Sequence, residues 1–371
     1  MTSFKHIAIV HDWLVSMRGG EKVLEVLCEL FPDATLFTLV HAKGKLSPVI
    51  ERMNIKTSFI QKLPFGLSHY QHFLPLYPTA IEQFDLSDFD LVISSSHAVA
   101  KGVRVRNTSL HICYCYTPMR YIWDQYEDYF SKDRSSLTAR IGMRVFLNYL
   151  RRWDVASSKR VHHFIAISKN VQERIKRIYG RESVVIYPPV DVQRFQLSHQ
   201  NEGYYLIVSA LVPYKRIDIA VEAFNQLGER LVIVGSGAEA QKLQKIAKKN
   251  IEFVGRASDE ELSEYYAGCR ALIFPGVEDF GIVPVEAMAC GKPVIAFREG
   301  GAMETVVENK SGIFFHEQNV ISLQNAVQSF EKLSFDASAI REYAMIFERA
   351  IFKQQIEKYI SEKAREFVAR R

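Results

Sequence analysis

The chain has 371 residues, of which 48% are hydrophobic, 24% charged and 12% aromatic. These are the proportions of an ordinary globular protein, and they exclude a disordered chain, a collagen and a coiled coil. The net charge of +5 suits an anionic ligand or membrane surface but is too small to indicate nucleic-acid binding by itself. Because a single hydrophobic core stops growing near about 250–300 residues, we expect two domains.

The five cysteines indicate a reducing compartment. Their number is odd and they lie in apolar runs such as residues 111–116, which is typical of buried thiols in a cytosolic protein. No run of about 18 apolar residues occurs, and the N-terminal residues lack the pattern of a cleaved leader. We therefore expect a cytoplasmic protein, and contact with the inner face of the cell membrane would be peripheral.

Short apolar runs alternate with helical patterns from the first residues onward, which predicts βαβ units and parallel sheets. The clearest helix begins at Gly20–Glu21, and Pro188 and Pro189 end the sixth strand. The strands predicted in this half are His6–Val10, Thr35–Val40, Leu91–Ser94, His111–Tyr116, His163–Ile167 and Ser183–Tyr187.

The polar stretch Gln196–Gly203 has the composition of a linker, and the pattern restarts after it. The segment from about Ala337 to Arg371 has a helical period. The elements predicted between them are strands Tyr205–Ser209, Arg230–Val234, Ile251–Val254, Ala271–Phe274 and Pro293–Ala296, with helices near 216–227, 238–249, 259–267 and 283–290. The fold class is therefore α/β, with two doubly wound, Rossmann-like domains and an active site expected in the cleft between them.

A pair of glycines opens the first helix, in the run Arg18-Gly19-Gly20-Glu21-Lys22. Glycines there let the backbone approach an anion, and a helix N-terminus supplies unpaired N–H groups and positive potential. A plain tight turn explains the same pattern equally well. No G-x4-G-K-[ST] run occurs, so phosphoryl transfer through a P-loop is not expected.

A second glycine turn, Gly235-Ser236-Gly237, follows the strand Arg230–Val234. It matches half of the dinucleotide fingerprint, with Ala240 in the place of the third glycine. Such a turn also serves other phosphate ligands or simple packing. A nucleotide-linked dehydrogenase stays open as a rival interpretation.

The most informative run extends from Phe274 to Gly291, where a strand ends, a loop follows and a helix begins. Pro284 fits the first turn of that helix. Glu278 in the loop and Glu286 in the first turn are expected to face the same end of the sheet, where ionised carboxylates accept hydrogen bonds from hydroxyl groups. The N–H groups that begin the helix suit an anion or sugar hydroxyls. A capped helix with one solvated acid is the alternative.

The run from Glu278 to Glu286 resembles the Glu-x7-Glu motif of the retaining glycosyltransferases of family 4, which have the GT-B architecture. Residues 208–216 resemble the phosphate-binding segment of that family, and 234–237 its second glycine turn. Residues 252–256 resemble the strand beside the nucleobase. The resemblance covers nearly the whole chain, and it implies two Rossmann-like domains with a C-terminal helix that crosses back onto the first.

The resemblance also implies a role for each matching residue. Glu286 would hold the ribose hydroxyls of a nucleotide sugar, and Glu278 the hydroxyls of the transferred sugar. Lys215 would contact the diphosphate and neutralise the charge that builds on the leaving group. This scheme needs no metal and no other cofactor. The remaining implied donor contacts are Gly19, Gly20, Arg216, Gly235, Arg256, Ala257, Phe280, Gly281 and Ile282.

Two positions depart from the family pattern. Ala210 stands where relatives usually carry an arginine, and Tyr116 where many carry a histidine that helps the sugar transfer. His97, after another strand, is the substitute candidate for that histidine, although a histidine at a strand end is more often structural. Arg120 and Tyr121, together with Tyr116, are the candidate acceptor contacts.

A basic segment between Arg140 and Arg181 carries eleven lysine or arginine residues and two acids. Apolar residues alternate with the cations, which predicts a basic amphipathic helix suited to an anionic membrane surface. Packing of the same helix on the first domain is the alternative. No motif that reads bases is present, so we expect no nucleic-acid partner.

Residues 111–121 resemble a subgroup of the family that builds bacterial surface polysaccharides and includes many mannosyltransferases. We therefore expect a metal-independent retaining enzyme that moves a hexose, with mannose from GDP-mannose favoured, onto a lipid-linked saccharide such as a polyprenyl-diphosphate-linked glycan. The alternatives are a UDP-sugar-dependent enzyme of the same fold and a nucleotide-sugar-binding protein with a degenerate site. The expected domains are 1–195 for the acceptor, 196–345 for the nucleotide sugar, and 346–371 as the returning helix.

Overall fold

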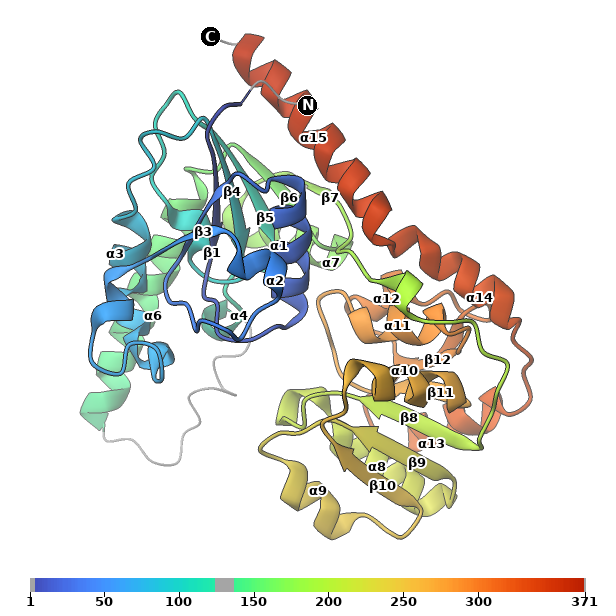
Figure 1. Cartoon of the computed structure of the whole chain (residues 1–371). Coiled ribbons are helices and arrows are strands. Elements are labelled where there is room, and N and C mark those ends of the chain that lie inside the picture. Colours follow the sequence, from blue (N-terminus) through green and yellow to red (C-terminus); the bar gives the residue numbers. More distant parts are fainter. Residues whose placement is uncertain (1–3, 124–136, 370–371) are drawn as a thin grey trace. The chain divides into compact units, whose positions relative to one another are not determined.

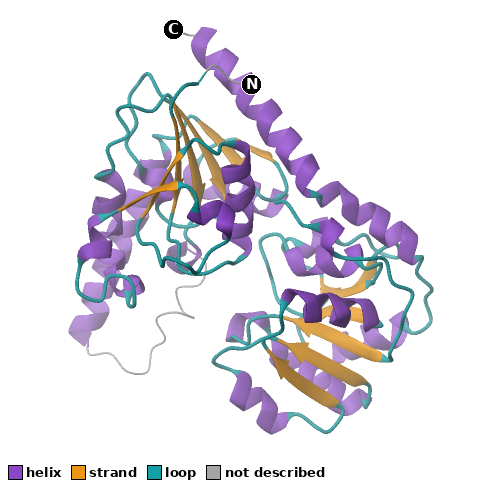
Figure 2. Cartoon of the chain, viewed as in Figure 1, coloured by secondary structure: helices purple, strands orange, loops and turns teal. Residues whose placement is uncertain are grey.

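The computed structural model describes residues 4–123 and 137–369, except for the side chains of Tyr121 and of 137–145. The chain divides into two compact units (Figure 1). Unit 1 consists of Met1–Pro189 and Phe352–Arg371, and unit 2 of Val190–Ile351. In each unit a parallel sheet is flanked by helices (Figure 2).

Unit 1 contains a seven-stranded parallel sheet in the order β3-β2-β1-β4-β5-β6-β7. Its strands are β1 (Ile7–His11), β2 (Thr35–Thr38), β3 (Asn54–Thr57), β4 (Leu91–Ser96), β5 (Leu110–Cys115), β6 (His163–Ala166) and β7 (Ser183–Val185). Its helices are α1 (Gly19–Leu30), α2 (Pro48–Glu51), α3 (Tyr77–Glu82), α4 (Arg120–Trp123), α6 (Leu137–Ser158), α7 (Lys169–Tyr179) and most of α15 (Arg349–Ala369), with 3-10 turns η1 (Phe59–Lys62), η2 (Tyr70–Leu76) and η3 (Ala100–Gly102).

Unit 2 contains a six-stranded parallel sheet in the order β10-β9-β8-β11-β12-β13. Its strands are β8 (Tyr204–Val208), β9 (Arg230–Val234), β10 (Ile251–Gly255), β11 (Ala271–Phe274), β12 (Val294–Phe297) and β13 (Gly312–Phe315). Its helices are α8 (Ile217–Leu227), α9 (Ala240–Ile246), α10 (Asp259–Gly268), α11 (Ile282–Ala289), α12 (Ala302–Thr305), α13 (Val320–Phe330) and α14 (Ala337–Ala344), with 3-10 turns η4 (Val192–Arg194), η5 (Pro213–Lys215) and η6 (Met345–Phe347).

Both sheets are buried in the way that parallel sheets require. All residues of β4 and β5 are buried, and so are those of β11 and β12. In unit 2 the apolar faces of α8 and α13 pack against one face of the sheet in a single cluster that includes Phe224, Leu323 and Phe330. The hydrophobic runs seen in the sequence thus become the cores of two doubly wound sheets, as predicted.

The predicted strands are all present, with ends that differ by no more than two residues. The sequence analysis missed β3 and β13, which both lie at the edge of a sheet. Strand β3 alternates exposed and half-buried residues, and β13 is the run Gly-Ile-Phe-Phe, in which only three residues have apolar side chains. Neither strand therefore carries the long apolar run that marks a central strand.

One helix prediction was wrong in its extent. The helix expected near 238–249 is limited to Ala240–Ile246, because Ala247 adopts an extended backbone and ends it. The C-terminal segment is helical, as predicted, and consists of more than one helix. α14 continues into η6, Glu348 is extended with a ψ of 148°, and α15 begins at the next residue.

In each sheet the chain order reverses between two neighbouring strands. These strands are β1 and β4 in unit 1, and β8 and β11 in unit 2. Open α/β sheets bind ligands beyond the carboxyl ends of the strands at such a point. We call these places the unit 1 switch point and the unit 2 switch point.

Candidate active site

The unit 1 switch point is filled by a buried polar cluster. His11 ends β1, and its Nδ1 atom lies 3.0 Å from the hydroxyl of Ser95 in β4. The Ser95 hydroxyl also lies 2.8 Å from the Tyr116 hydroxyl, which donates to the carbonyl oxygen of Gly20 at 2.8 Å. Burial raises the pKa of Tyr116 well above its ordinary value, so its hydroxyl stays protonated. The ends of three strands and the glycine turn of α1 therefore belong to one network.

Asp12 holds the loop that carries His97. Its carboxylate is fully buried and accepts hydrogen bonds from the backbone N–H groups of residues 97–100, at distances of 2.6 to 3.0 Å. The Asp12 Oδ2 atom also lies 3.1 Å from His97 Nδ1. One buried acid therefore fixes both the backbone of this loop and the direction of the imidazole.

The imidazole of His97 is arranged to accept a hydrogen bond. Its side chain is 29% exposed. Burial lowers the pKa of His97 below its ordinary value although the Asp12 charge opposes the change, so the ring is neutral at pH 7. With Asp12 beside Nδ1, the proton of the neutral ring is on Nδ1 and Nε2 is a bare acceptor. No residue in the described part of the chain hydrogen-bonds to Nε2.

Packing does not require a glycine at position 20, in the turn that opens α1. A Cβ atom on Gly20 would meet its nearest neighbour, the Tyr116 ring, at 3.7 Å, which is ordinary contact. Glu21 accepts the Arg18 N–H at 3.0 Å, and its other oxygen lies 3.7 Å from His11 Nε2. Burial would raise the pKa of Glu21, but the hydrogen bond and charge of His11 leave the pKa below its ordinary value.

The unit 2 switch point carries an ion pair between Lys215 and Glu278. Lys215 ends η5, which follows β8, and Glu278 lies in the loop after β11. Their side chains are 17% and 25% exposed. A Cβ atom on Gly276 would lie 3.0 Å from the carbonyl oxygen of Lys215, so the two loops pack backbone against backbone.

Gly301 supports the Glu278 loop from its other side. Its N–H donates to the carbonyl oxygen of Glu278 at 2.8 Å. A Cβ atom at this position would overlap the backbone of Phe280, so only glycine fits. Gly301 was not among the predicted site residues, although the glycine pair at 300–301 shortly after β12 was an available signal for it.

The second glycine turn has a similar packing reason. Gly235 has a φ of 141°, and a Cβ atom there would overlap the carbonyl oxygen of Ser209. The exposed Arg256 lies beyond the next strand, and its Nε donates to the Ser236 hydroxyl at 3.1 Å. Ala257 follows and is half-buried. The turn and the end of β10 are thus neighbours.

The two acids of the Glu-x7-Glu run have different environments. Glu286 is the fifth residue of α11, one residue beyond the expected first turn, and is only 5% exposed. It accepts the Tyr266 hydroxyl at 2.9 Å, and burial raises the pKa of Tyr266 well above its ordinary value. Phe280 is buried, and Gly281, with a φ of 92°, precedes the first residue of α11, Ile282.

Two family models match the chain. One, described as Glycosyltransferase Family 4, matches residues 17–194, and the other, described as Glycosyl transferases group 1, matches residues 190–346. The chain belongs to the family 4 glycosyltransferases of the GT-B type. The two models divide near residue 190, where unit 2 begins.

Curated relatives match part of this glycosyltransferase. The O-antigen chain mannosyltransferase RfbU of Salmonella typhimurium is 26% identical over 59% of the chain and 64% of its own length. A GDP-mannose-dependent alpha-(1-6)-phosphatidylinositol monomannoside mannosyltransferase of Mycolicibacterium smegmatis is 31% identical over 43% of the chain and 50% of its own length. The chain thus spans about half to two thirds of the length of such relatives.

A solved structure with a similar fold is HepE of Anabaena in complex with UDP. Its TM-score is 0.72 at 19% identity, and the match covers 96% of this chain and 100% of that one. At this identity the similarity concerns the fold alone. It agrees with the two doubly wound sheets seen in this glycosyltransferase.

Other predicted site residues of the glycosyltransferase are less well placed. Arg216, with a φ of 54°, turns its guanidinium toward Asp218 and Gln318, each at 3.2 Å. Arg120 is half-buried at the start of α4, and the side chain of Tyr121 lies outside the described residues. Ala210 is exposed.

The basic segment 140–181 is not one helix throughout, because it contains the strand that was predicted at His163–Ile167. It comprises α6, strand β6 and α7, because the apolar run His163–Ala166 pairs with β5 and β7. Several of its cations are used within unit 1. Arg160 pairs with Glu82, and Arg181 donates to backbone carbonyl oxygens of residues 158, 161 and 162.

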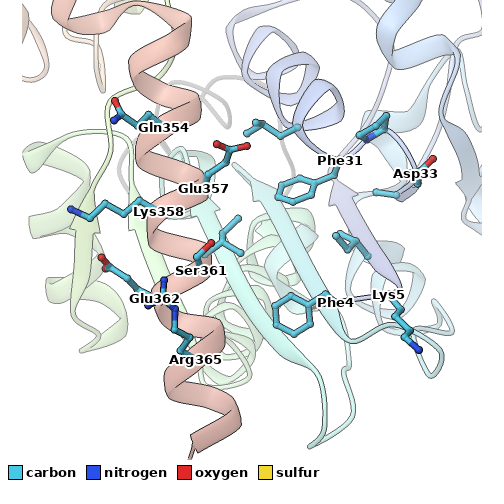
Figure 3. A pocket seen from close by; sticks show the side chains of 15 residues that line it. Phe4, Lys5, Phe31, Asp33, Gln354, Glu357, Lys358, Ser361, Glu362 and Arg365 are labelled. Atoms are coloured by element: carbon cyan, nitrogen blue, oxygen red, sulfur yellow. The ribbon is translucent and has the colours of Figure 1, made fainter. Parts of the chain in front are cut away.

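A cavity of about 760 Å³ lies elsewhere in unit 1. Figure 3 shows Phe4 and Phe31 on one side of it and Glu357 and Lys358 of α15 on the other. Because Ile7, the first residue of β1, lines it, this cavity is at the amino end of the strand and not at the switch point. None of the predicted site residues lines it.

Residues 4–123 and 137–369 contain neither a cluster suited to a metal ion nor a helix suited to cross a membrane. Among these residues no three or more His, Cys, Asp or Glu side chains gather in a way that would hold a metal ion. No helix in the same ranges combines the length and the hydropathy needed to cross a bilayer.

Proposed function

We propose that the protein is a retaining hexosyltransferase that moves a sugar from a nucleotide sugar to a glycan acceptor. The ion pair of Lys215 and Glu278 at the unit 2 switch point is the observation that carries the proposal. Glycosyl transfer needs a cation beside the departing diphosphate and an acceptor for sugar hydroxyls. Lys215 and Glu278 supply these two groups on adjoining loops.

In this scheme Lys215 stabilises the negative charge that develops on the diphosphate as the glycosidic bond breaks. A preorganised charge that acts on the transition state is worth roughly 100- to 1000-fold in rate. Glu278 accepts hydrogen bonds from hydroxyls of the sugar. The ion pair keeps both side chains in place before the donor binds, and the donor then replaces each partner with its own diphosphate or hydroxyl group.

Unit 1 would contribute His97 and the glycine turn of α1. The Nε2 atom of His97 is a bare acceptor, so it can take a hydrogen bond from a hydroxyl of either substrate. Asp12 is a positioning residue that acts through His97. Gly20 has no packing reason to lack a side chain, which favours close approach of a ligand over a plain turn.

GDP-mannose is the donor we favour, because the two mannosyltransferases named above are among the relatives and the name of one includes GDP-mannose. A UDP-sugar is the alternative, since HepE was solved with UDP. Thermal shifts with GDP and UDP separate the two. A ligand at 100 times its Kd stabilises the folded state by about 2.7 kcal/mol. A shift with UDP but not with GDP would exclude GDP-mannose.

The proposed acceptor is a lipid-linked saccharide at the inner face of the cell membrane. One relative is named for an O-antigen chain and another for a phosphatidylinositol monomannoside, whose name describes a saccharide joined to a phospholipid. Exposed cations of the basic segment, such as Arg152 and Lys159, remain available for anionic lipid. Tyr116, Arg120 and Tyr121 are the proposed acceptor contacts.

The test of the transfer reaction is Glu278→Ala, compared with Glu222→Ala on the exposed face of α8. We expect Glu278→Ala to lower transfer and donor hydrolysis by at least roughly 100-fold. Its thermal shift with nucleotide should stay close to that of the wild type, because Glu278 is assigned to the sugar. Full activity in Glu278→Ala would contradict the proposed site.

A nucleotide-sugar-binding protein without transfer is the second candidate. It is favoured by Ala210, which offers no charge to the diphosphate, and by the engagement of Arg216 with Asp218. Release of nucleotide from the preferred donor by the wild type would exclude it. Binding without release would support it over the enzyme.

A further inference from the structure

The segment Phe59–Leu76 of unit 1 has an exposed aromatic tip. Phe65 is 74% exposed and has a φ of 59°, in the left-handed region. A bulky residue in this conformation is strained, and here no burial of its side chain compensates. The next residue, Gly66, fits only as glycine because a Cβ atom would overlap the carbonyl oxygen of Ile60. The turn is therefore fixed, and it presents a phenyl ring to the surroundings.

The exposed residues of this segment are apolar, polar or basic, and the segment contains no acid. Leu76 is 39% exposed, and Lys62, His69 and His72 are exposed as well. The rings of Phe65 and His69 lie 5.7 Å apart and those of His69 and His72 lie 5.5 Å apart. Apolar side chains flanked by cationic or titratable groups, without carboxylates, match the chemistry of an anionic lipid surface.

The inner side of the segment leads to the unit 1 switch point. Tyr70 packs on Trp13 with ring centroids 5.5 Å apart, and Trp13 packs edge-on against His97 at 4.4 Å. Phe73 and Leu74 join the hydrophobic cluster that contains Leu147 and Leu150 of α6. The exposed tip, the basic helix α6 and His97 are thus connected through one packed region of unit 1.

We propose that Phe59–Leu76 is a membrane-contact surface that inserts Phe65 into the interface of an anionic bilayer. The choice of a bilayer as the partner rests on the lipid-linked acceptor of the proposed function. Phe65 and Leu76 enter the boundary of the acyl chains, and Lys62 faces the phosphates. Contact at this surface brings membrane-borne saccharides to the side of unit 1 on which Trp13 and His97 lie.

The first experiment is flotation of the full chain with vesicles of phosphatidylcholine, with and without phosphatidylglycerol. Phe65→Asn is the test variant, because asparagine tolerates the left-handed conformation and is polar. Ile321→Asn on α13 is the matched control, since Ile321 is 68% exposed and lies in unit 2. We expect Phe65→Asn to bind vesicles with phosphatidylglycerol about tenfold more weakly than the wild type, and Ile321→Asn to bind as the wild type does.

Two control measurements show that the variant is intact. The melting temperature of Phe65→Asn should equal or exceed that of the wild type, because the substitution relieves strain and removes little packing. Its thermal shift with nucleotide should be unchanged. A loss of vesicle binding together with these two results supports the proposal independently of the sugar-transfer assay.

A spectroscopic measurement locates the tip. The tryptophan fluorescence of Phe65→Trp should be quenched by lipids brominated on the acyl chain. The fluorescence of Ile321→Trp should show only the quenching of the natural tryptophans. The proposal is overturned if the wild type does not bind vesicles, or if Phe65→Asn binds as well as the wild type. It is also overturned if the variant changes only the sedimentation of the lipid-free protein, which would indicate a protein contact. None of these outcomes bears on Glu278 or on donor hydrolysis.

Discussion

The two switch points are built by different means. In unit 1, side chains make the structure: a buried carboxylate, Asp12, accepts four backbone hydrogen bonds, and His11, Ser95 and Tyr116 are linked through hydroxyl groups. In unit 2, close contacts of the backbone make it: loops touch at glycines where a Cβ atom would not fit, and the ion pair of Lys215 and Glu278 joins two of the loops. The same strand order thus supports two kinds of site.

This difference has a chemical consequence. A hydrogen-bond network fixes the direction and the tautomer of a side chain, so unit 1 is suited to present the Nε2 atom of His97. Close packing of loops fixes the positions of backbone groups and of the Cα atoms from which the site side chains extend. Unit 2 is therefore suited to hold a charged, hydroxyl-rich donor. Unit 1 should therefore respond to changes of charge and pH, and unit 2 to added volume.

Substitution of His97 by its two amide analogues should give the largest effect. Asn places a donor near the position of Nδ1, and Gln places an acceptor near that of Nε2. If Nε2 acts on substrate, His97→Asn should lower kcat by roughly 100-fold while His97→Gln retains more activity. If His97 acts only through its contact with Asp12, His97→Gln should instead lower kcat more than His97→Asn does. Steady-state kinetics with the preferred donor and acceptor decide between the two.

Addition of one methyl group should give the second-largest effect, and this effect should differ between the two units. Gly301→Ala forces a Cβ atom into the backbone of Phe280, and we expect a loss of about 2 kcal/mol in the free energy of unfolding. Gly20→Ala has room for its Cβ and gains helix propensity, so its stability should change by less than about 1 kcal/mol. Urea denaturation measures both.

The same pair also tests the ligand role of Gly20. Gly20→Ala should weaken nucleotide-sugar binding although the fold is intact, because the methyl group occupies the place of the approaching ligand. If Gly20→Ala has the stability and the nucleotide-sugar binding of the wild type, ligand binding does not require a glycine at this position. A large loss of stability in Gly20→Ala would contradict the ordinary contact distances that a Cβ atom would have at this position.

The smallest expected effect is a dependence on pH that is confined to unit 1. Burial lowers the pKa of His111 to about 3 and also lowers that of His97, so the unfolded chain takes up protons at a higher pH than the folded one. The stabilisation is therefore complete above about pH 6.5 and is lost as the pH falls toward 3. His111 alone should contribute a loss of about 1.4 kcal/mol between pH 7.5 and 5.5.

Hydrogen exchange resolved by peptide, corrected for intrinsic rates, measures this difference. Peptides from β4 and β5 should lose protection at pH 5.5, while those from β8 and β11 should not, since His199 and His316 of unit 2 are exposed. Equal losses in both units would mean that the buried histidines are not the cause.

Much of the fold was determined by local patterns in the sequence. The central strands carry apolar runs that any parallel sheet must bury, and the two glycine turns and the Glu278–Glu286 spacing are contiguous features. These signals are enough to predict two doubly wound sheets and to identify the loops that follow β1, β9 and β11 as candidate ligand contacts. The edge strands β3 and β13 lack such a run, since β3 alternates exposed and half-buried residues and β13 begins with a glycine.

The tertiary structure alone decided how the sites are held. Asp12 and the backbone of residues 97–100 are more than eighty residues apart, and they meet only because β1 and β4 are neighbours. Lys215 and Glu278 meet for the same reason across β8 and β11. A sequence specifies strands through short-range periodicity, but the pairing of a buried acid with a distant loop depends on strand order, which the local pattern does not encode.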